Sequence, residues 1–176
     1  MRMRTVLISL LALAAAVLAG CGGSSSAGGI ETAPSGGATQ AQVATTPKPP
    51  PALAKEPVVT VPKGPAPAKL VTKDLVVGTG QTAKAGDTIV VNYVGVLYKT
   101  GKEFDSSWSR NTPFTTPLSA GQVIPGWVQG IPGMKVGGRR ELIIPSSLAY
   151  GKSGSGTTIP PNSPLVFVVD LLSISS

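Results

Sequence analysis

The stretch that decides the fold covers residues 121–130 and reads Gly121-Gln122-Val123-Ile124-Pro125-Gly126-Trp127-Val128-Gln129-Gly130. Proline is favourable in the first turn of a helix, where its missing N–H costs no hydrogen bond. Pro132 and Gly133 then end the predicted helix after about two turns. A helix this short is unstable alone in water, so other elements must surround it. Trp127 is therefore either the floor of a pocket or a part of the core.

Alternating apolar residues predict strands on both sides of this helix. The clearest strand covers residues 87–97, and because both of its faces are apolar we expect it near the centre of a sheet. The other predicted strands cover residues 69–77, 103–106, 114–118, 139–144 and 165–174, with a long Gly-, Ser- and Pro-rich loop over 145–164. Five or six strands with one short helix predict an antiparallel α+β domain at residues 69–176, long enough to bury its own core.

The N-terminus predicts export. Arg2 and Arg4 precede the apolar run Val6–Leu18, which is typical of a signal peptide over residues 1–20. The following Leu18-Ala19-Gly20-Cys21 is similar to a bacterial lipobox, in which the cysteine is lipidated. The alternative is an ordinary signal peptide with a chance cysteine, which we consider weaker because Cys21 is the only cysteine of the chain. Acyl chains on Cys21 would hold the protein at the extracytoplasmic face of a bacterial membrane, as a cell-membrane or periplasmic lipoprotein.

Residues 21–68 are predicted to form a disordered tether. Residues 22–46 are mostly Gly, Ser, Ala and Thr and cannot form a core, and residues 47–67 contain eight prolines, which favour extended polyproline II. The segment would act as a spacer between the membrane and the folded domain, although a merely disordered leader would have the same composition.

The composition excludes several classes of protein. The chain has no histidine, one cysteine and eight acidic residues, so a Ser-His-Asp triad, a Cys-His dyad and a metal centre are not expected. We therefore expect no metal and no cofactor. The net charge of +7 comes without a basic run and with few aromatic residues. It favours solubility and membrane-surface affinity over nucleic-acid binding, and nothing in the sequence requires an oligomer, so we expect a monomer.

Eight segments of the predicted domain are distinctive: Val91–Gly95, Glu103–Ser107, Arg110–Phe114, Val123–Trp127, Met134–Gly138, Leu148–Gly151, Ile159–Ser163 and Leu165–Phe167. In this order and spacing they resemble FKBP-type peptidyl-prolyl cis-trans isomerases, over about residues 70–174. The resemblance implies a twisted antiparallel sheet wrapped around one short helix, with the active pocket between them, and rotamase activity without a cofactor.

The same resemblance implies which residues form the site. The substrate pocket would be lined by Tyr93, Phe104, Asp105, Phe114, Val123, Ile124, Trp127, Tyr150, Ile159 and Phe167, with Arg110 paired to Asp105. The candidate catalytic residues are Tyr93, Asp105, Tyr150 and Phe167, and Trp127 would be the floor. Taken singly, each phenylalanine could be a core residue and Asp105 could begin a turn. As an ordered set, they favour the pocket.

Some residues depart from the common family pattern. Gln122 replaces a frequent acidic residue, Thr158 replaces an aliphatic residue, and Trp108 adds an aromatic side chain that we expect beside the pocket. These changes concern the rim, and therefore the peptide preference and the affinity for macrolide inhibitors.

Three functions are consistent with these features. The first is an exported isomerase that acts on proline-containing peptides and on unfolded exported proteins. The second is a membrane-tethered FKBP-fold chaperone or partner-binding module, in which isomerase activity is incidental. The third is a structural lipoprotein in which the tether matters most. The ordered set of pocket residues favours the enzyme.

Overall fold

The structure is a computed structural model that describes residues 51–175. The predicted signal peptide, the lipobox with Cys21 and the first part of the tether lie outside the described residues. The described elements, in chain order, are the 3-10 helix η1 (Pro51–Leu53), β1 (Val71–Val76), β2 (Thr88–Leu97), β3 (Glu103–Ser106), β4 (Phe114–Pro117), α1 (Pro125–Gly130), β5 (Arg139–Ile144), the 3-10 helix η2 (Ser146–Leu148) and β6 (Leu165–Ser175).

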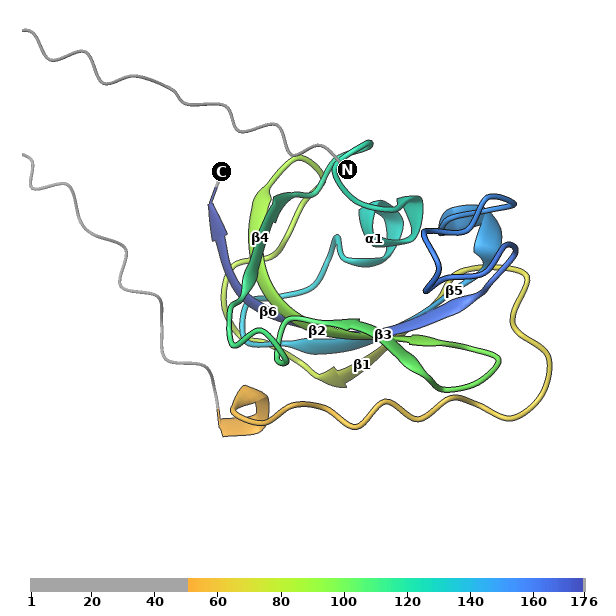
Figure 1. Ribbon diagram of the computed structural model, residues 1–176. Helices are drawn as coiled ribbons and strands as arrows, with labels where there is room; N and C mark the ends of the chain where they lie inside the picture. Colours follow the sequence, from red (N-terminus) through yellow and green to blue (C-terminus); the bar gives the residue numbers. More distant parts are fainter. Residues whose placement is uncertain (1–50, 176) are drawn as a thin grey trace, which may run out of the picture. The chain divides into compact units, whose positions relative to one another are not determined.

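The strands form one six-stranded antiparallel sheet in the order β1-β5-β6-β2-β3, with β4 also paired to β2. The predicted fold class, a five- to six-stranded antiparallel sheet with one short helix, is confirmed. β2 pairs with β6 along one edge and with β3 and β4 along the other, which is the central position predicted from its two apolar faces. The sheet curves around α1, which lies on its concave side (Figure 1).

The main core lies between the concave face of the sheet and α1. It contains Ile89 and Val91 of β2, Leu142 and Ile144 of β5, and Trp127 of α1, all of them buried. Pro125 stands in the first turn of α1, after Ile124 in extended conformation. A Cβ atom on Gly126 would come within 2.5 Å of Ile144 Cγ2, so glycine allows the helix to approach β5 this closely. Helix α1 is thus stabilised by Pro125 in its first turn and by its close contact with β5.

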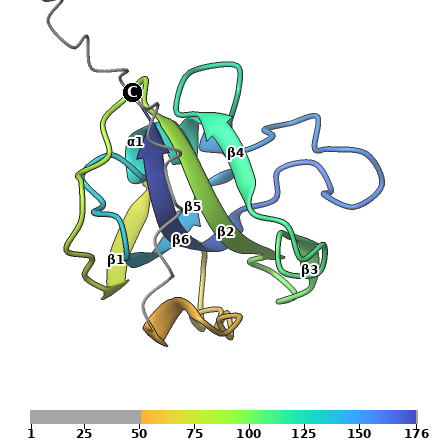
Figure 2. The same ribbon diagram turned by 90° about the vertical axis from the view of Figure 1, so that its left-hand side faces the viewer.

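A second apolar cluster lies on the outer, convex face of the sheet. It consists of Val94, Val96, Tyr98, Ile143 and Val166, and Val59, Val61, Ala66 and Trp108 pack against it. We call residues 53–66, which cross this face, the strap. The strap and η1 lie on the opposite side of the sheet from α1 in both views (Figures 1 and 2).

The strap differs from the sequence prediction, which placed residues 53–66 in a disordered tether. A Pro-rich segment has too few apolar residues to build a core of its own. The strap needs no core of its own, because the outer face of the sheet provides an apolar surface on which Val59 and Val61 pack. Trp108, expected beside the pocket, packs against the same outer cluster.

Candidate active site

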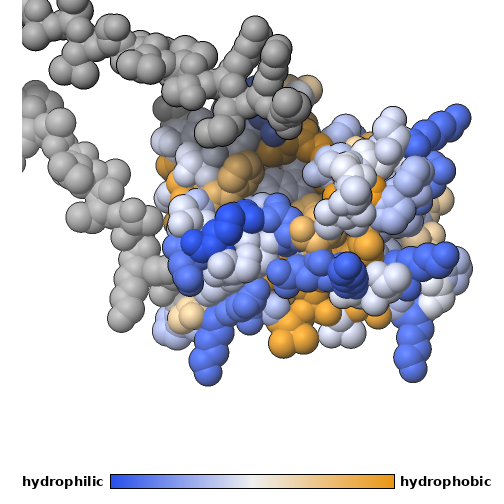
Figure 3. Space-filling model, in the orientation of Figure 1, coloured by the Kyte–Doolittle hydropathy of each residue, from blue (hydrophilic) through white to orange (hydrophobic). Residues whose placement is uncertain are grey.

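A cavity of about 470 Å³ opens between α1 and the concave face of the sheet. In the space-filling view, apolar surface lies in a hollow bordered by more hydrophilic residues (Figure 3). The cavity is lined by Tyr93, Phe104, Asp105, Arg110, Phe114, Gln122, Val123, Ile124, Trp127, Tyr150 and Phe167. The structure thus brings together residues from β2, β3, β4, α1, β6 and the loops between them.

This lining contains every pocket residue predicted from the sequence except Ile159. It also contains Gln122. Ile159 is not part of this lining. It is buried in the main core, which also contains Tyr93, Trp127 and Phe167 of the lining, and its backbone pairs with Ser155. Gln122 was predicted to belong to the rim, and its place next to Val123 in the sequence is the signal that links it to the pocket.

Five aromatic rings of the cavity contact one another, mostly edge to face: those of Tyr93, Phe104, Phe114, Trp127 and Phe167. Trp127 and Phe167 are each only 4 % exposed, whereas Phe114 and Tyr150 are 37 % and 38 % exposed and stand at the rim. The ring centroid of Trp127 lies 5.4 Å from that of Tyr93 and 5.4 Å from that of Phe167, in T-shaped geometry. Edge-to-face contacts fix ring orientations more firmly than apolar burial alone does. The cavity therefore has stiff apolar walls.

Gly95 makes room for two of these rings. It lies on β2 two residues after Tyr93, on the same face of the strand. A Cβ atom at this position would come within 2.7 Å of Phe104 Cζ and 2.8 Å of Phe167 Cε1. Since Phe104 and Phe167 themselves meet edge to face at 5.5 Å, a larger residue at position 95 would push one ring out of the wall.

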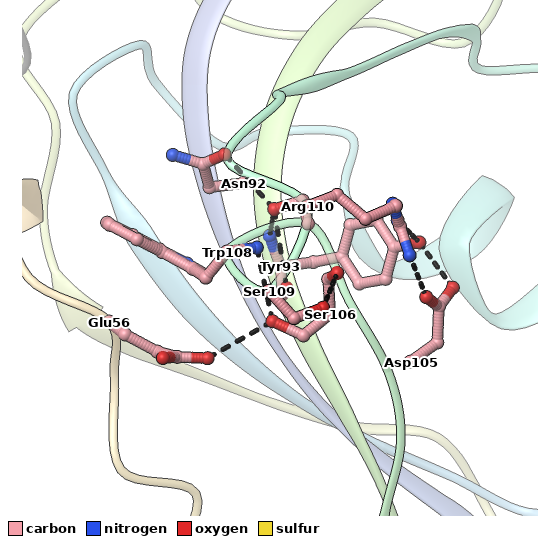
Figure 4. Close-up of polar contacts among 9 residues, drawn as sticks. Glu56, Asn92, Tyr93, Asp105, Ser106, Trp108, Ser109 and Arg110 are labelled. Atoms are coloured by element: carbon pink, nitrogen blue, oxygen red, sulfur yellow. Dashed lines mark hydrogen bonds and ion pairs between the residues drawn. The ribbon is translucent and has the colours of Figure 1, made fainter.

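Asp105 is the acidic residue of the cavity lining, and the side chains of two neighbours hold its carboxylate. The Tyr93 hydroxyl donates a hydrogen bond of 2.5 Å to Oδ2, and Arg110 Nη1 donates to Oδ1 and forms an ion pair. Arg110 Nη2 also donates to the Tyr93 hydroxyl oxygen, at 2.8 Å. The three side chains form one closed network (Figure 4). The ion pair between Arg110 and Asp105 is the one expected from the sequence.

The network sets the protonation states of the site. Burial favours the neutral form of Asp105, but the hydrogen bonds from Tyr93 and Arg110 outweigh it and hold the pKa of this carboxyl below its ordinary value. Burial, aided by the hydrogen bond to Asp105, raises the pKa of Tyr93 to about 12. Burial also raises the pKa of Tyr150, as does the Asp105 charge. At neutral pH the cavity therefore contains one carboxylate and two protonated phenols, and the Tyr150 hydroxyl forms no hydrogen bond with any other residue of 51–175.

Other features of the described residues limit the possible chemistry. Within residues 51–175, no group of three His, Cys, Asp or Glu side chains could hold a metal ion, and no helix is long and apolar enough to cross a membrane. The Trp127 Nε1 atom is buried and has no hydrogen-bond partner in this part of the chain. What the cavity offers is an apolar aromatic surface, one fixed negative charge and a hydroxyl donor.

A larger groove of about 800 Å³ lies on the outer face, between the strap and the turn at residues 98–101. It has one aromatic residue, Tyr98, and no carboxylate in its lining. The smaller cavity, which gathers the aromatic rings and the paired Asp105, is therefore the candidate active site.

Comparison with known proteins identifies the family. The sequence profile of the FKBP-type peptidyl-prolyl cis-trans isomerases matches residues 79–172. The chain belongs to this family. Its domain is accordingly a peptidyl-prolyl cis-trans isomerase, as the resemblance of its motifs implied.

Relatives support this FKBP assignment across most of the domain. The chain is 54 % identical over 121 residues to an FK506-binding protein of Streptomyces anulatus, covering 68 % of this chain and 98 % of the relative. It is 48 % identical over 105 residues to an FK506-binding protein of Neisseria meningitidis serogroup B, covering 60 % and 95 %.

Two solved structures share the fold of this FKBP domain. The crystal structure of AtFKBP13 has a TM-score of 0.57 and 41 % identity, and the alignment covers 62 % of this chain and 96 % of that one. FkpA from Escherichia coli also has a TM-score of 0.57, with 44 % identity, and the alignment covers 70 % of this chain and 55 % of that one.

Proposed function

We propose that this isomerase accelerates cis-trans exchange of X–Pro bonds in exported proteins, and that it does so by non-covalent binding in the aromatic cavity. The observation that supports this proposal most is the set of rings around Trp127 with the paired Asp105 at its edge. A prolyl ring is a compact apolar group, which suits a cavity of about 470 Å³ with stiff walls.

The chemistry requires no covalent step. An X–Pro bond rotates over a barrier of about 18–20 kcal/mol, because rotation breaks the amide resonance. Resonance places charge on the carbonyl oxygen and the nitrogen, and water stabilises this planar form. An apolar cavity removes the water and thereby favours the twisted, less polar state. An acceleration of ~10⁴-fold needs about 5–6 kcal/mol of preferential stabilisation of the transition state.

In this proposal the cavity residues have distinct roles. Trp127, Phe104, Phe114 and Phe167 hold the prolyl ring, with Val123 and Ile124 as one wall. Tyr150 donates a hydrogen bond to a substrate carbonyl, which is consistent with its protonated hydroxyl at the rim. Asp105 places a negative charge beside the rotating carbonyl carbon, held in position by Arg110 and Tyr93.

A rim substitution tests the cavity in the full chain. Phe114 is partly exposed, and its ring meets those of Tyr93 and Trp127 edge to face at 5.9 Å and 6.4 Å. Phe114→Ala should lower kcat/KM for a proline peptide by roughly tenfold while the far-UV spectrum stays unchanged. Val77→Ala, at an exposed position outside the cavity lining, is the control and should keep full activity. Equal activity of the wild type and the Phe114→Ala variant would show that the cavity does not take part in catalysis.

The same cavity is proposed to bind FK506-type macrolides. Two of the relatives described above carry the name FK506-binding protein. We expect FK506 to inhibit peptide isomerisation competitively, and Phe114→Ala to weaken this inhibition. The altered rim at Gln122 leads us to expect an affinity that differs from that of those relatives.

The location of the enzyme is proposed from Cys21 and the sequence before it. Lipidated Cys21 would hold the isomerase at the extracytoplasmic face of a bacterial membrane, where its substrates would be unfolded exported proteins. Mass spectrometry of the N-terminal peptide should find acyl chains on Cys21, and Cys21→Ser should move the protein from the membrane to the soluble fraction. An unmodified Cys21 in membrane-free protein would contradict the anchor and leave the isomerase assignment intact.

A further inference from the structure

The strap, residues 53–66, is bound to the outer face of the sheet by its side chains. Leu53 is 1 % exposed and Pro57 is also buried. Further along, Val59 and Val61 pack on the outer cluster, whereas Val58, just before Val59, is 91 % exposed, and Thr60, between the two valines, is exposed too. This alternation shows that one side of the strap faces the sheet. The segment lies before residues 79–172, which carry the family profile.

Three hydrogen bonds join the strap to the sheet and to its loops. Arg139 Nη2 donates to the carbonyl oxygen of Lys55 at 2.8 Å, while the same guanidinium binds Asp170. Ser106 Oγ donates to Glu56 Oε1 at 3.1 Å. Near the other end, the Tyr98 hydroxyl donates to the carbonyl oxygen of Pro65 at 3.4 Å. The strap is therefore attached near both of its ends, with apolar contacts between them.

The bond from Ser106 to Glu56 links the strap to the active site. Ser106 follows Asp105 on β3, so the side chains of these two residues point to opposite faces of the sheet. Ser106 is 1 % exposed, and its Oγ also accepts a hydrogen bond from the Trp108 amide at 3.1 Å. Its carbonyl oxygen accepts one from Ser109 Oγ at 2.8 Å. Ser106 is thus one of two buried serines that hold loop 106–110 (Figure 4). The other is Ser107, whose Oγ accepts a hydrogen bond from the Tyr93 amide at 2.9 Å and donates one to Asn92 Oδ1 at 3.0 Å.

This loop carries Arg110, which pairs with Asp105 in the cavity. Arg110 is about half exposed, so its ion pair with Asp105 depends on how the loop presents it. A buried hydroxyl that loses its acceptor is costly, and Ser106 would turn to another partner if Glu56 were absent. The loop would then hold Arg110 less rigidly, and the ion pair between Arg110 and Asp105 would form less often.

We infer that the strap is an integral part of the isomerase domain, and that Glu56 is a positioning residue that acts through Ser106 on the loop carrying Arg110. The structural part of this inference stands on the contacts of the strap alone. The part that concerns Glu56 rests on the proposed function of the cavity.

Substitutions in the full chain test the structural part. Val59→Ser combined with Val61→Ser removes the apolar contact with the outer cluster and should lower Tm by about 4–8 °C. Val58→Ser is the matched control, because it makes the same change at an exposed position, and should leave Tm within about 1 °C. The same Tm for the double variant and the control would show that the strap is not part of the domain.

The role of Glu56 is tested by rescue. Glu56→Ala should lower kcat/KM for a proline peptide about two- to fivefold with little change in Tm, and Glu56→Gln should restore it, because the amide oxygen can accept the same hydrogen bond. Glu103→Ala is the control. Glu103 is exposed on the same strand as Ser106, and its side chain forms no hydrogen bond within residues 51–175. Full activity of Glu56→Ala, or no rescue by Glu56→Gln, would overturn this role. An inactive wild type would instead contradict the proposed function itself.

Discussion

Tyr93 and Asp105 are joined across two neighbouring strands by a hydrogen bond of 2.5 Å from the phenol to the carboxylate. The strand pairing explains the contact. Asp105 of β3 stands opposite Gly95 of β2, and Tyr93 lies two residues along β2 on the same face. Diagonal neighbours of this kind are within reach of a long side chain. The Asp105 carboxylate is thereby fixed at the edge of the cavity, where it accepts hydrogen bonds from the Tyr93 phenol and the Arg110 guanidinium.

Removing this phenol should weaken the site without opening the core. In Tyr93→Phe the ring keeps its contacts with Trp127 and Phe167, but Asp105 loses one of its two side-chain donors. Since a hydrogen bond to a charged group contributes about 1.5–3 kcal/mol, we expect kcat/KM to fall roughly tenfold. Steady-state kinetics with a proline peptide measure this effect. Unchanged kinetics would show that the orientation of Asp105 does not matter for catalysis.

Tyr150 gives a separate test, because its hydroxyl is predicted to bind the substrate and not the enzyme. It stands at the rim and no other described side chain binds its hydroxyl. Tyr150→Phe should therefore lower kcat/KM about three- to tenfold while Tm stays the same. If Tm fell in step with activity, the residue would be structural.

The activity should be independent of pH over about pH 5 to pH 9. The pKa of Asp105 lies below its ordinary value of 3.8, so this carboxylate stays charged throughout that range. The stability it contributes is complete above its unfolded pKa and is lost as the pH falls through the lower folded pKa. The pKa of Tyr93 is raised from 10.0 to about 12, so the folded state loses stability as the pH rises between these values. A titration of kcat/KM with a midpoint between about pH 6 and pH 8 would contradict this assignment, since the chain has no histidine.

Arg140 should hold the floor of the cavity in place. Its Nη1 donates to the carbonyl oxygens of Gly130 and Pro132, at and just beyond the C-terminal end of α1, and its other nitrogens bind Asp74 of β1. Hydrogen bonds from Arg140 also lower the pKa of Asp74. Arg140→Met leaves the helix end without this donor, and should lower Tm by about 4–8 °C and raise KM more than it lowers kcat.

Arg140→Lys is the control for this prediction, because it keeps the charge but cannot span the carboxylate and the helix end together. We expect it to recover only part of the stability, as measured by thermal unfolding. Full recovery by lysine would show that charge alone, and not the guanidinium geometry, secures α1.

The fold could be predicted largely because its strands carry clear periodic patterns. β2 has apolar residues on both faces, and this is the property of a central strand that pairs with β6 and with β3 and β4. The helix bounds followed from Pro125 and from Pro132 with Gly133, which act locally. The site residues followed from the order of the family motifs, and all but Ile159 line the cavity.

Two features could not be predicted, and both depend on distant contacts. Ile159 was assigned to the pocket wall from its motif, but the long loop buries it outside the cavity lining. The strap is Pro-rich and would not fold alone, yet it packs on a surface formed by β2, β5 and β6. Val59, Thr60 and Val61 alternate between apolar and polar, which was the local signal for a one-sided segment, but so short a pattern has meaning only when the outer face of the sheet is known.

The most direct test of the central claim is exchange NMR on an X–Pro peptide mixed with the full chain. Cis and trans forms of the free peptide exchange over ~10–100 s. With the isomerase we expect exchange cross-peaks on a sub-second timescale, together with a shift of the Trp127 indole N–H resonance as the peptide enters the cavity. If the peptide shifts that resonance but exchange remains at the uncatalysed rate, the cavity is a binding site and the claim that it catalyses isomerisation is wrong.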